Sequence, residues 1–311
     1  MHLVATLVEG HFLKGAAALY NSLVAHGFDG CFVVGHRGKG DLPADLVQRM
    51  SGLPGDSPAI EFVSLDTPLH FTNYKPHFLE SLFANRPGVT AITYLDPDIV
   101  CLAPWHWLRS WPEHSVTVAG DVNWRMGPEH PIRHAWMKRV ASLNLPVKRK
   151  PETYYNGGLL AIPRRDAAFL GLWRTIIDDF AGKETALDGQ GEITLWRKEG
   201  RWNLFHTPDQ DALNIAVMLW SGEICALGPD AMGFAPGGAP LIPHAVGPDK
   251  PWLRANLKEA LRGRPPRVVD KAFWEFCGGP VQVCSPIQLR RQRRILALCA
   301  LLGRFYRRGG L

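Results

Sequence analysis

Strand-like and helix-like segments alternate along the first 125 residues of the chain. Runs of apolar, β-branched and aromatic residues, typical of buried strands, occur at 3–8, 31–38, 60–66, 89–95 and 115–123. Apolar residues with helical spacing occur between them, at 10–27, 43–50 and 75–85. This alternation is typical of α/β proteins, so we predict a Rossmann-like, mostly parallel sheet flanked by helices. The glycine-rich turns of dinucleotide-binding and P-loop proteins are absent, so a nucleotide would be held in another way.

The length and composition of the chain allow a sizeable hydrophobic core. The chain has 311 residues, of which 46% are apolar and 21% charged, which suits one large domain or two small ones. No run reaches the roughly 20 apolar residues of a membrane span. The first ten residues, MHLVATLVEG, are interpreted as a strand rather than a signal peptide. The six cysteines lack zinc-like spacing, so we expect them to be reduced, in a cytoplasmic protein.

The basic character of the chain comes from its C-terminal end. The formal net charge is +6, and residues 285–311 contain seven arginines and no acidic residue. Without this segment the formal charge is −1, so the rest of the chain is close to neutral. Nucleic-acid binding is therefore a weak hypothesis, and we expect no nucleic-acid partner.

Two carboxylates follow one of the expected strands. In the segment YLDPDIV, Asp96 and Asp98 come directly after the apolar run 89–95, with Pro97 between them. Alternate residues of an extended chain point to the same side, and the proline favours extended backbone at Asp96. We therefore expect both carboxylates to project together from the strand tip, where they would suit a divalent cation such as Mg²⁺ or Mn²⁺. The alternative interpretation is an ordinary Asp-Pro-Asp turn.

Three further polar segments lie in the second half of the chain. YYNGGLLAI (154–162) joins a glycine pair to a short apolar strand. DQDALN (209–214) places polar residues just before an expected amphipathic helix, and HAVGPDKPW (244–252) has the composition of a loop. Each motif alone is weak evidence for membership of a known family. All three in this order, together with YLDPDIV, are strong evidence for it.

In this order, the four motifs resemble those of the family 8 glycosyltransferases, which include bacterial lipopolysaccharide galactosyltransferases and glycogenin. The resemblance covers about residues 1–252. It implies a GT-A fold and transfer of a sugar, with retention of the anomeric configuration, from a nucleotide-diphosphate sugar to an acceptor hydroxyl. It also implies Mn²⁺ or Mg²⁺ as cofactor, a UDP-sugar as the expected donor, and a cell-surface glycan or lipid-linked oligosaccharide as the acceptor.

The resemblance also implies roles for individual residues. The metal ligands would be Asp96, Asp98 and His244. The donor contacts would be Thr6, Lys75, Asn156, Gly157, Gly247 and Lys250. The residues facing the reacting carbon would be Asp209 and Gln210, with Gln210 supporting an oxocarbenium-like state. Further substrate contacts would come from Asp121, Trp124 and Asp211. For Asp211, the alternative is that it caps and packs the start of the helix together with Asn214.

Two departures from the family pattern leave the donor open. The acidic residue that often follows the first strand and helps to hold the base is replaced here by a shifted Glu9, and NGG replaces the commoner N-[SA]-G. Two other kinds of protein are alternatives. One is a non-catalytic nucleotide-sugar binding protein. The other is a sugar-1-phosphate nucleotidyltransferase, which needs a glycine-rich, arginine-containing loop that VATLVEGH (4–11) does not provide.

The expected domain organisation places all four motifs before a basic C-terminal tail. Residues 1–252 would form the glycosyltransferase domain, with a nucleotide-binding half at 1–125 and an acceptor and metal half at 126–252. Residues 253–311 would be an extension ending in a basic amphipathic helix, in which the apolar run Ile295–Leu302 lies between arginine clusters. Such a helix suits the anionic inner face of a membrane. The alternative is a helix packed on the body with solvated arginines.

Overall fold

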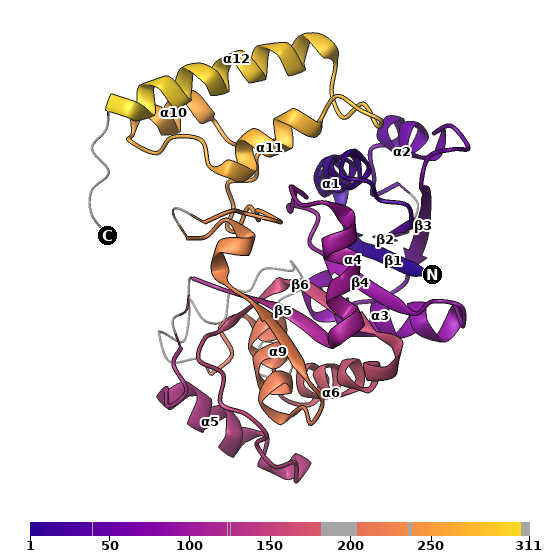
Figure 1. Ribbon diagram of the computed structural model, residues 1–311, viewed down its shortest axis with the longest axis vertical. Coiled ribbons are helices and arrows are strands. Elements are labelled where there is room, and N and C mark those ends of the chain that lie inside the picture. The colour runs from indigo at the N-terminus through magenta and orange to yellow at the C-terminus, as the bar shows by residue number, and fades with distance from the viewer. Residues whose placement is uncertain (39, 123, 125, 182–203, 236–237, 306–311) are drawn as a thin grey trace. The chain divides into compact units, whose positions relative to one another are not determined.

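The computed structural model describes residues 1–38, 40–122, 124, 126–181, 204–235 and 238–305 (Figure 1). Its seven strands are β1 (His2–Val8), β2 (Cys31–Arg37), β3 (Ala59–Leu65), β4 (Ala91–Leu95), β5 (Val116–Gly120), β6 (Tyr155–Pro163) and β7 (Ile224–Leu227). They form one sheet in the order β3-β2-β1-β4-β6-β5-β7. The predicted α/β class, with helices flanking a mostly parallel sheet, is confirmed.

Strand β6 is the antiparallel strand of this mixed sheet. The pairs β1–β4, β2–β3 and β5–β7 are parallel, whereas β6 runs antiparallel to both β4 and β5. All residues of β6 are buried, as expected for an apolar strand with a neighbour on each edge. Leu95, the last residue of β4, pairs with Leu159. Asn156 and Gly157, near the start of β6, therefore lie just beyond the carboxyl end of β4.

The helices of the described residues are mostly short. They are α1 (Leu13–Ala25), α2 (Ala44–Ser51), α3 (Phe71–Asn85), α4 (Trp105–His114), α5 (Pro131–Arg139), α6 (Ala168–Ile176), α9 (Pro208–Leu219), α10 (Asn256–Leu261), α11 (Val268–Phe276) and α12 (Pro286–Leu302). Among them, none is long and apolar enough to cross a membrane.

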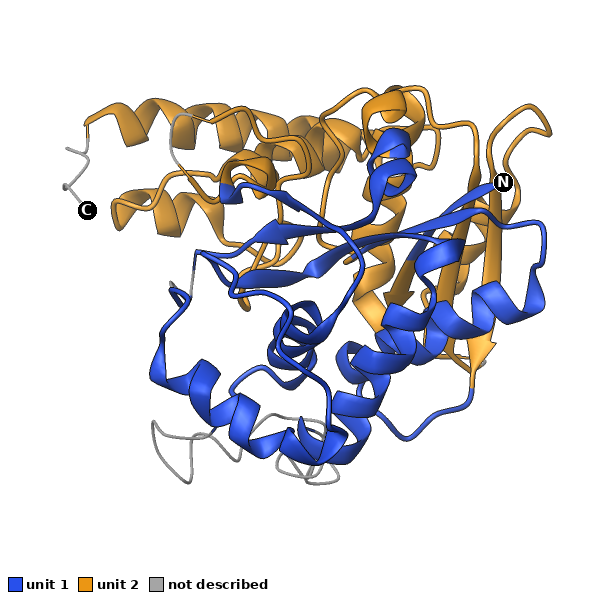
Figure 2. Ribbon diagram, turned by 60° about the horizontal axis from the view of Figure 1, so that its bottom comes forward, with its two compact units in different colours: residues 1–5, 66–95, 109–229 blue, residues 6–65, 96–108, 230–311 orange. Residues whose placement is uncertain are grey.

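The chain divides into two compact, interleaved units (Figure 2). Unit 1 comprises residues 1–5, 66–95 and 109–229, and unit 2 comprises residues 6–65, 96–108 and 230–311. In unit 1, α6 packs on α3 and α9, and α9 packs on β6. In unit 2, α11 packs on α1 and α12, and α10 packs on α12. The chain crosses from one unit to the other within β1 and directly after β4.

Two helix starts differ from the sequence prediction. The helix expected at 75–85 begins at Phe71, because the His70 side chain accepts a hydrogen bond from the Thr72 N–H and caps the helix four residues earlier. The polar residues expected just before a helix at 209 lie within the first turn of α9, which begins at Pro208. All residues of α9 are buried, so this helix is not amphipathic; the polar side chains of its first turn are satisfied internally.

Candidate functional site

The first polar cluster lies in unit 2 and is built where the chain leaves β4. The Ile99 N–H donates to the Asp96 carbonyl at 3.1 Å, so the Asp-Pro-Asp segment does form a turn. Ile99 also pairs with His244 in an isolated antiparallel bridge, and the Ala245 N–H donates to the Asp98 carbonyl at 3.0 Å. These backbone contacts bring the HAVGPDKPW segment to the two aspartates.

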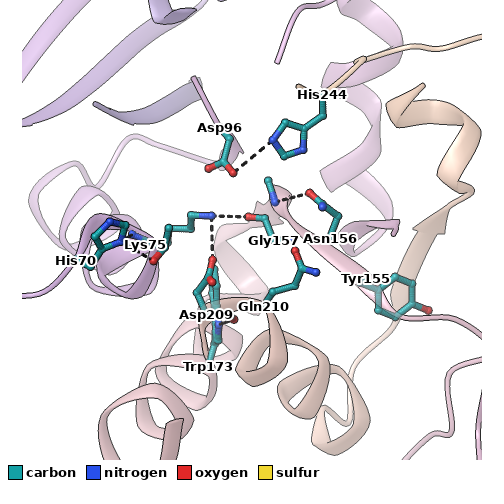
Figure 3. A network of polar contacts seen from close by, with 12 residues as sticks. His70, Lys75, Asp96, Tyr155, Asn156, Gly157, Trp173, Asp209, Gln210 and His244 are labelled. Carbon is teal, nitrogen blue, oxygen red and sulfur yellow. Dashed lines mark hydrogen bonds and ion pairs between the residues drawn. The ribbon is translucent and has the colours of Figure 1, made fainter. Parts of the chain in front are cut away.

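The side chains of Asp96, Asp98 and His244 converge, although the backbone is a turn. His244 Nε2 lies 3.1 Å from Asp98 Oδ1 and 3.8 Å from Asp96 Oδ2, and one ligand atom from each residue lies within 4.8 Å of the others. Figure 3 shows Asp96 and His244 directed toward one another. Two carboxylates and an imidazole are a donor set that suits Mn²⁺ or Mg²⁺, provided that His244 presents an unprotonated nitrogen.

The two aspartates differ in burial, although their side chains converge. The side chain of Asp96 is 21% exposed and that of Asp98 only 4%. Lys250 Nζ lies 2.5 Å from Asp98 Oδ2 and donates to the Ala245 carbonyl at 2.9 Å. Burial by itself would raise the pKa of Asp98, but His244 and then Lys250 outweigh it and hold the pKa well below its usual range. These two cationic neighbours therefore favour the ionised form of Asp98.

Two other residues expected to contact the donor belong to unit 2. Gly247 has a φ of +83°, a left-handed conformation that favours glycine, in the loop between His244 and Lys250. Thr6, in β1, is fully buried, and its Oγ1 has no hydrogen-bond partner among the described residues. An orphaned buried hydroxyl is costly unless something binds it, so Thr6 is a candidate contact for a ligand.

The second polar cluster lies in unit 1, where α3 and α9 meet β6. Lys75 Nζ donates to the Gly157 carbonyl at 2.9 Å and forms an ion pair with Asp209 Oδ2 at 3.1 Å (Figure 3). Both side chains are at most 5% exposed, so each charge depends on the other; removing one partner of such a pair costs about 3–5 kcal/mol. A Cβ on Gly157 would lie 3.1 Å from Asp209 Oδ2, a tight contact that would require Asp209 to shift slightly.

The amide group of Gln210 is held at both ends. Its Oε1 accepts from the Gly157 N–H at 2.7 Å, and its Nε2 donates to Asp121 Oδ2 at 3.0 Å. The same Asp121 oxygen accepts from Asn156 Nδ2 at 2.7 Å. Hydrogen bonds thus join Asp121, Asn156, Gly157 and Gln210, all of them predicted site residues, into one buried network in unit 1.

Asp211 points to a different set of partners. Its Oδ1 accepts from the Tyr154 hydroxyl at 2.6 Å, and its Oδ2 accepts from the Thr207 N–H at 2.8 Å. Burial raises the pKa of Asp211 to about 7, although the hydrogen bond from Tyr154 opposes the shift. Asn214 Oδ1 accepts from the Tyr155 N–H, and its Nδ2 donates to the Tyr155 and Gln210 carbonyls. These contacts are those of the capping and packing alternative.

The sequence did not point to two of the supporting residues. Trp173 Nε1, from α6, donates to the Asp209 carbonyl at 2.8 Å, and Tyr154 anchors Asp211. A tryptophan on a helix carries no signal of such a contact, whereas Tyr154 is the first residue of the YYNGGLLAI motif. Trp124, expected to contact substrate, stacks on His206 with ring centroids 5.0 Å apart and an interplanar angle of 26°.

Comparisons with known proteins locate the fold among sugar-transferring enzymes. No protein-family model matches the chain, and no curated protein matches it. The solved structure of the galactosyltransferase LgtC, in complex with donor and acceptor sugar analogs, is 16% identical, with a TM-score of 0.55 over 94% of this chain and 100% of LgtC.

Two other solved glycosyltransferases are similar over nearly the whole of this chain. The bifunctional glycosyltransferase WbbM is 14% identical with a TM-score of 0.56, and the match covers 94% of this chain and 51% of WbbM. This chain therefore spans about half the length of WbbM. GlyE of Streptococcus pneumoniae is 14% identical with a TM-score of 0.53, over 93% of this chain and 62% of GlyE. At these identities the likeness concerns the fold, and the chain has the GT-A fold of glycosyltransferases.

Proposed function

We propose that this protein is a metal-dependent, retaining glycosyltransferase that uses a nucleotide-diphosphate sugar, with UDP as the expected nucleotide. The observation that carries the proposal is the arrangement around Asp98, a buried carboxylate with His244 and Lys250 on its two oxygens and Asp96 close by. A cationic group and a metal-ligand set at one place suit a diphosphate. The proposed domain is residues 1–252, followed by an extension at 253–311.

In this proposal, the unit 2 cluster binds the nucleotide and its diphosphate. Asp96, Asp98 and His244 hold the cation, which supplies Lewis-acid stabilisation of the negative charge on the leaving diphosphate. Lys250 contacts the diphosphate as a second cation, and the left-handed backbone at Gly247 exposes main-chain groups to phosphate. Thr6 offers its orphaned hydroxyl to the nucleotide.

The unit 1 network carries the sugar chemistry in this proposal. Gln210 is a poor nucleophile whose amide is fixed by Gly157 and Asp121, so it would support an oxocarbenium-like state by its dipole. Asp209 orients a sugar hydroxyl while Lys75 balances its charge. Asp121, Asn156 and Trp124 are proposed as further contacts.

Metal-dependent donor hydrolysis in the absence of acceptor tests this function. We expect metal-stripped protein to leave UDP-glucose and UDP-galactose intact, and expect added Mn²⁺ to start slow release of UDP from at least one of them. EDTA should stop the release, and excess Mn²⁺ should restore it. Full turnover by metal-stripped protein in EDTA would contradict the mechanism. Metal-dependent binding of a donor without turnover, even with sugar acceptors present, would indicate a nucleotide-sugar binding protein instead.

The C-terminal helix α12 has two different faces. Leu289, Leu296 and Cys299 are buried, so the helix packs within unit 2 against α10 and α11. Arg293 also belongs to this packing, because its guanidinium donates to the carbonyls of Trp274 and Glu275 at the end of α11. The predicted alternative of a packed helix is therefore correct for this face.

The outer face of α12 is basic and apolar. Arg290, Arg291 and Arg294 line a hollow of about 630 Å³ together with Ile287 and Ile295. Several large apolar side chains near the end of the chain stay exposed, namely Ile287, Leu298, Leu301 and Phe305. Residues 306–311 of the expected tail lie outside the described part of the chain. We propose that this face rests on an anionic membrane surface, on the cytoplasmic side, where a glycolipid acceptor would be met.

Neutralising the outer arginines tests the membrane proposal without removing the packed face. The triple variant R290Q/R291Q/R294Q is expected to lose binding to vesicles containing phosphatidylserine at low salt, because each arginine near such a surface contributes about 1 kcal/mol. Donor hydrolysis should be unchanged. The matched control K138Q/K148Q/K271Q removes three exposed positive charges elsewhere and should still sediment with the vesicles. If both triple variants bind vesicles as the unmodified protein does, α12 is not the anchor.

A further inference from the structure

Lys250 forms an ion pair with Asp98, a carboxylate that is proposed to bind the metal. Its Nζ lies 2.5 Å from Asp98 Oδ2, and it is held there by a second hydrogen bond, of 2.9 Å, to the Ala245 carbonyl. The ammonium also lies 5.7 Å from the centroid of the Phe12 ring. Only 14% of the Lys250 side chain is exposed. The Lys250 ammonium is thus held by specific contacts and does not extend into solvent.

Both oxygens of Asp98 are engaged in this arrangement. His244 Nε2 contacts Oδ1, and Lys250 Nζ contacts Oδ2. The side chain of Asp98 is only 4% exposed. A buried carboxylate needs such partners, because an unpaired charge in a poorly solvated place is costly. For the same reason, a divalent cation approaching Asp98 meets a positive charge on the same carboxylate, and like charges repel strongly where water does not screen them.

We propose that Lys250 is the counter-cation of Asp98 in the metal-free protein, and that it opposes metal binding until the donor diphosphate draws it away. This inference rests on the proposed function and adds a regulation to it. The flexible four-carbon stem and the three donors of lysine suit transfer of the ammonium from a carboxylate to a phosphate oxygen. Metal and donor should therefore bind with a strong positive coupling that requires the charge at position 250.

If Lys250 only oriented Asp98, its replacement would change the affinity for the metal in the opposite direction. If Lys250 served to hold Asp98 in the geometry that binds the cation, its loss would weaken metal binding in the absence of donor. If Lys250 is a competing cation, its loss strengthens that binding. The affinity of the metal alone therefore distinguishes the two roles, without any measurement of activity.

The test is titration of the metal-stripped protein with Mn²⁺ alone, followed by the electron paramagnetic resonance signal of free Mn²⁺. Lys250→Met, which keeps an unbranched side chain only one atom shorter and removes its charge, is expected to bind Mn²⁺ at least tenfold more tightly than the unmodified protein. Lys250→Arg keeps the charge and should stay within a few-fold of the unmodified protein. Lys271→Met, at an exposed lysine of α11, removes an equal charge elsewhere in unit 2 and should change nothing.

The second measurement repeats the titration with saturating UDP as the probe. In the unmodified protein UDP should tighten Mn²⁺ binding strongly, and in Lys250→Met this gain should shrink by at least tenfold, because no ammonium remains to be released. Unfolding of each metal-free variant followed by circular dichroism checks that it is folded, with Lys250→Arg as the variant that retains the ion pair.

The outcomes separate this inference from the proposed function. If Lys250→Met binds Mn²⁺ no more tightly than the unmodified protein, Lys250 does not oppose the metal and the inference is wrong, while the metal site stands. If neither the unmodified protein nor any variant binds Mn²⁺ at millimolar concentration, the proposed metal site fails, and this inference fails with it.

Discussion

Replacing Asp96 by alanine is expected to lower glycosyl transfer by about a thousandfold while leaving the fold intact. Asp96 is a proposed metal ligand, and its loss removes a group that helps to neutralise the leaving diphosphate. Its side chain is 21% exposed, so water can reach the position after the substitution and the fold should be kept. The measurement is donor hydrolysis and transfer at saturating Mn²⁺, together with the thermal midpoint of unfolding.

The matched control is Asp56→Ala, at an exposed aspartate of unit 2. It should leave both turnover and the unfolding midpoint unchanged. Retention of more than a tenth of the activity by Asp96→Ala would remove this residue from the metal cluster. Asp98→Asn should also abolish transfer, but with a loss of stability, because the Lys250 ammonium would remain partly buried without its carboxylate.

Replacing Gln210 by alanine is expected to lower kcat by about 10²–10³-fold and to change the KM for the donor only slightly. The amide would stabilise the transition state rather than the bound donor, since its dipole is already fixed by the Gly157 N–H and by Asp121. The measurement is steady-state transfer with the donor varied at saturating acceptor and metal.

A glutamate at the same position gives a sharper test of the amide. Gln210→Glu keeps an oxygen for the Gly157 N–H, but it places a second carboxylate against Asp121, where the amide donated a hydrogen bond. Gln210→Glu should lower kcat as well. Such a result would show that a nucleophilic carboxylate cannot replace the amide at this position. Gln48→Ala, on the exposed side of α2, is the matched control for the amide loss. An unchanged kcat in Gln210→Ala would take Gln210 out of the site.

Sequence reasoning predicted the local elements of the first half well, because they depend on patterns that lie within one segment. The strand expected at 31–38 is β2 at Cys31–Arg37, and that expected at 60–66 is β3 at Ala59–Leu65. The predicted start of α3 was wrong because the residue that caps it, His70, is not one of the usual N-cap residues.

The contacts of the candidate site were less predictable than its residues. The family resemblance of the motifs implied roles for Asp98, His244 and Lys250, but the direct ion pair between Lys250 and Asp98 joins residues 152 positions apart. Likewise, Trp173 reaches the Asp209 carbonyl from another helix. Such pairings depend on how elements pack, and a hydrophobic pattern specifies which residues are buried without specifying which polar group each one meets.

The bridge between Ile99 and His244 can form only late in the synthesis of the chain, because it joins two distant segments. The contact between Asp98 and His244 spans 146 positions, and contacts that close such long loops form late because loop closure costs chain entropy. A nascent chain that has exposed YLDPDIV still lacks His244 and Lys250. Its two aspartates therefore leave the ribosome before their partners exist, and the proposed cation site can form only when translation has passed residue 250 and the tertiary contacts close.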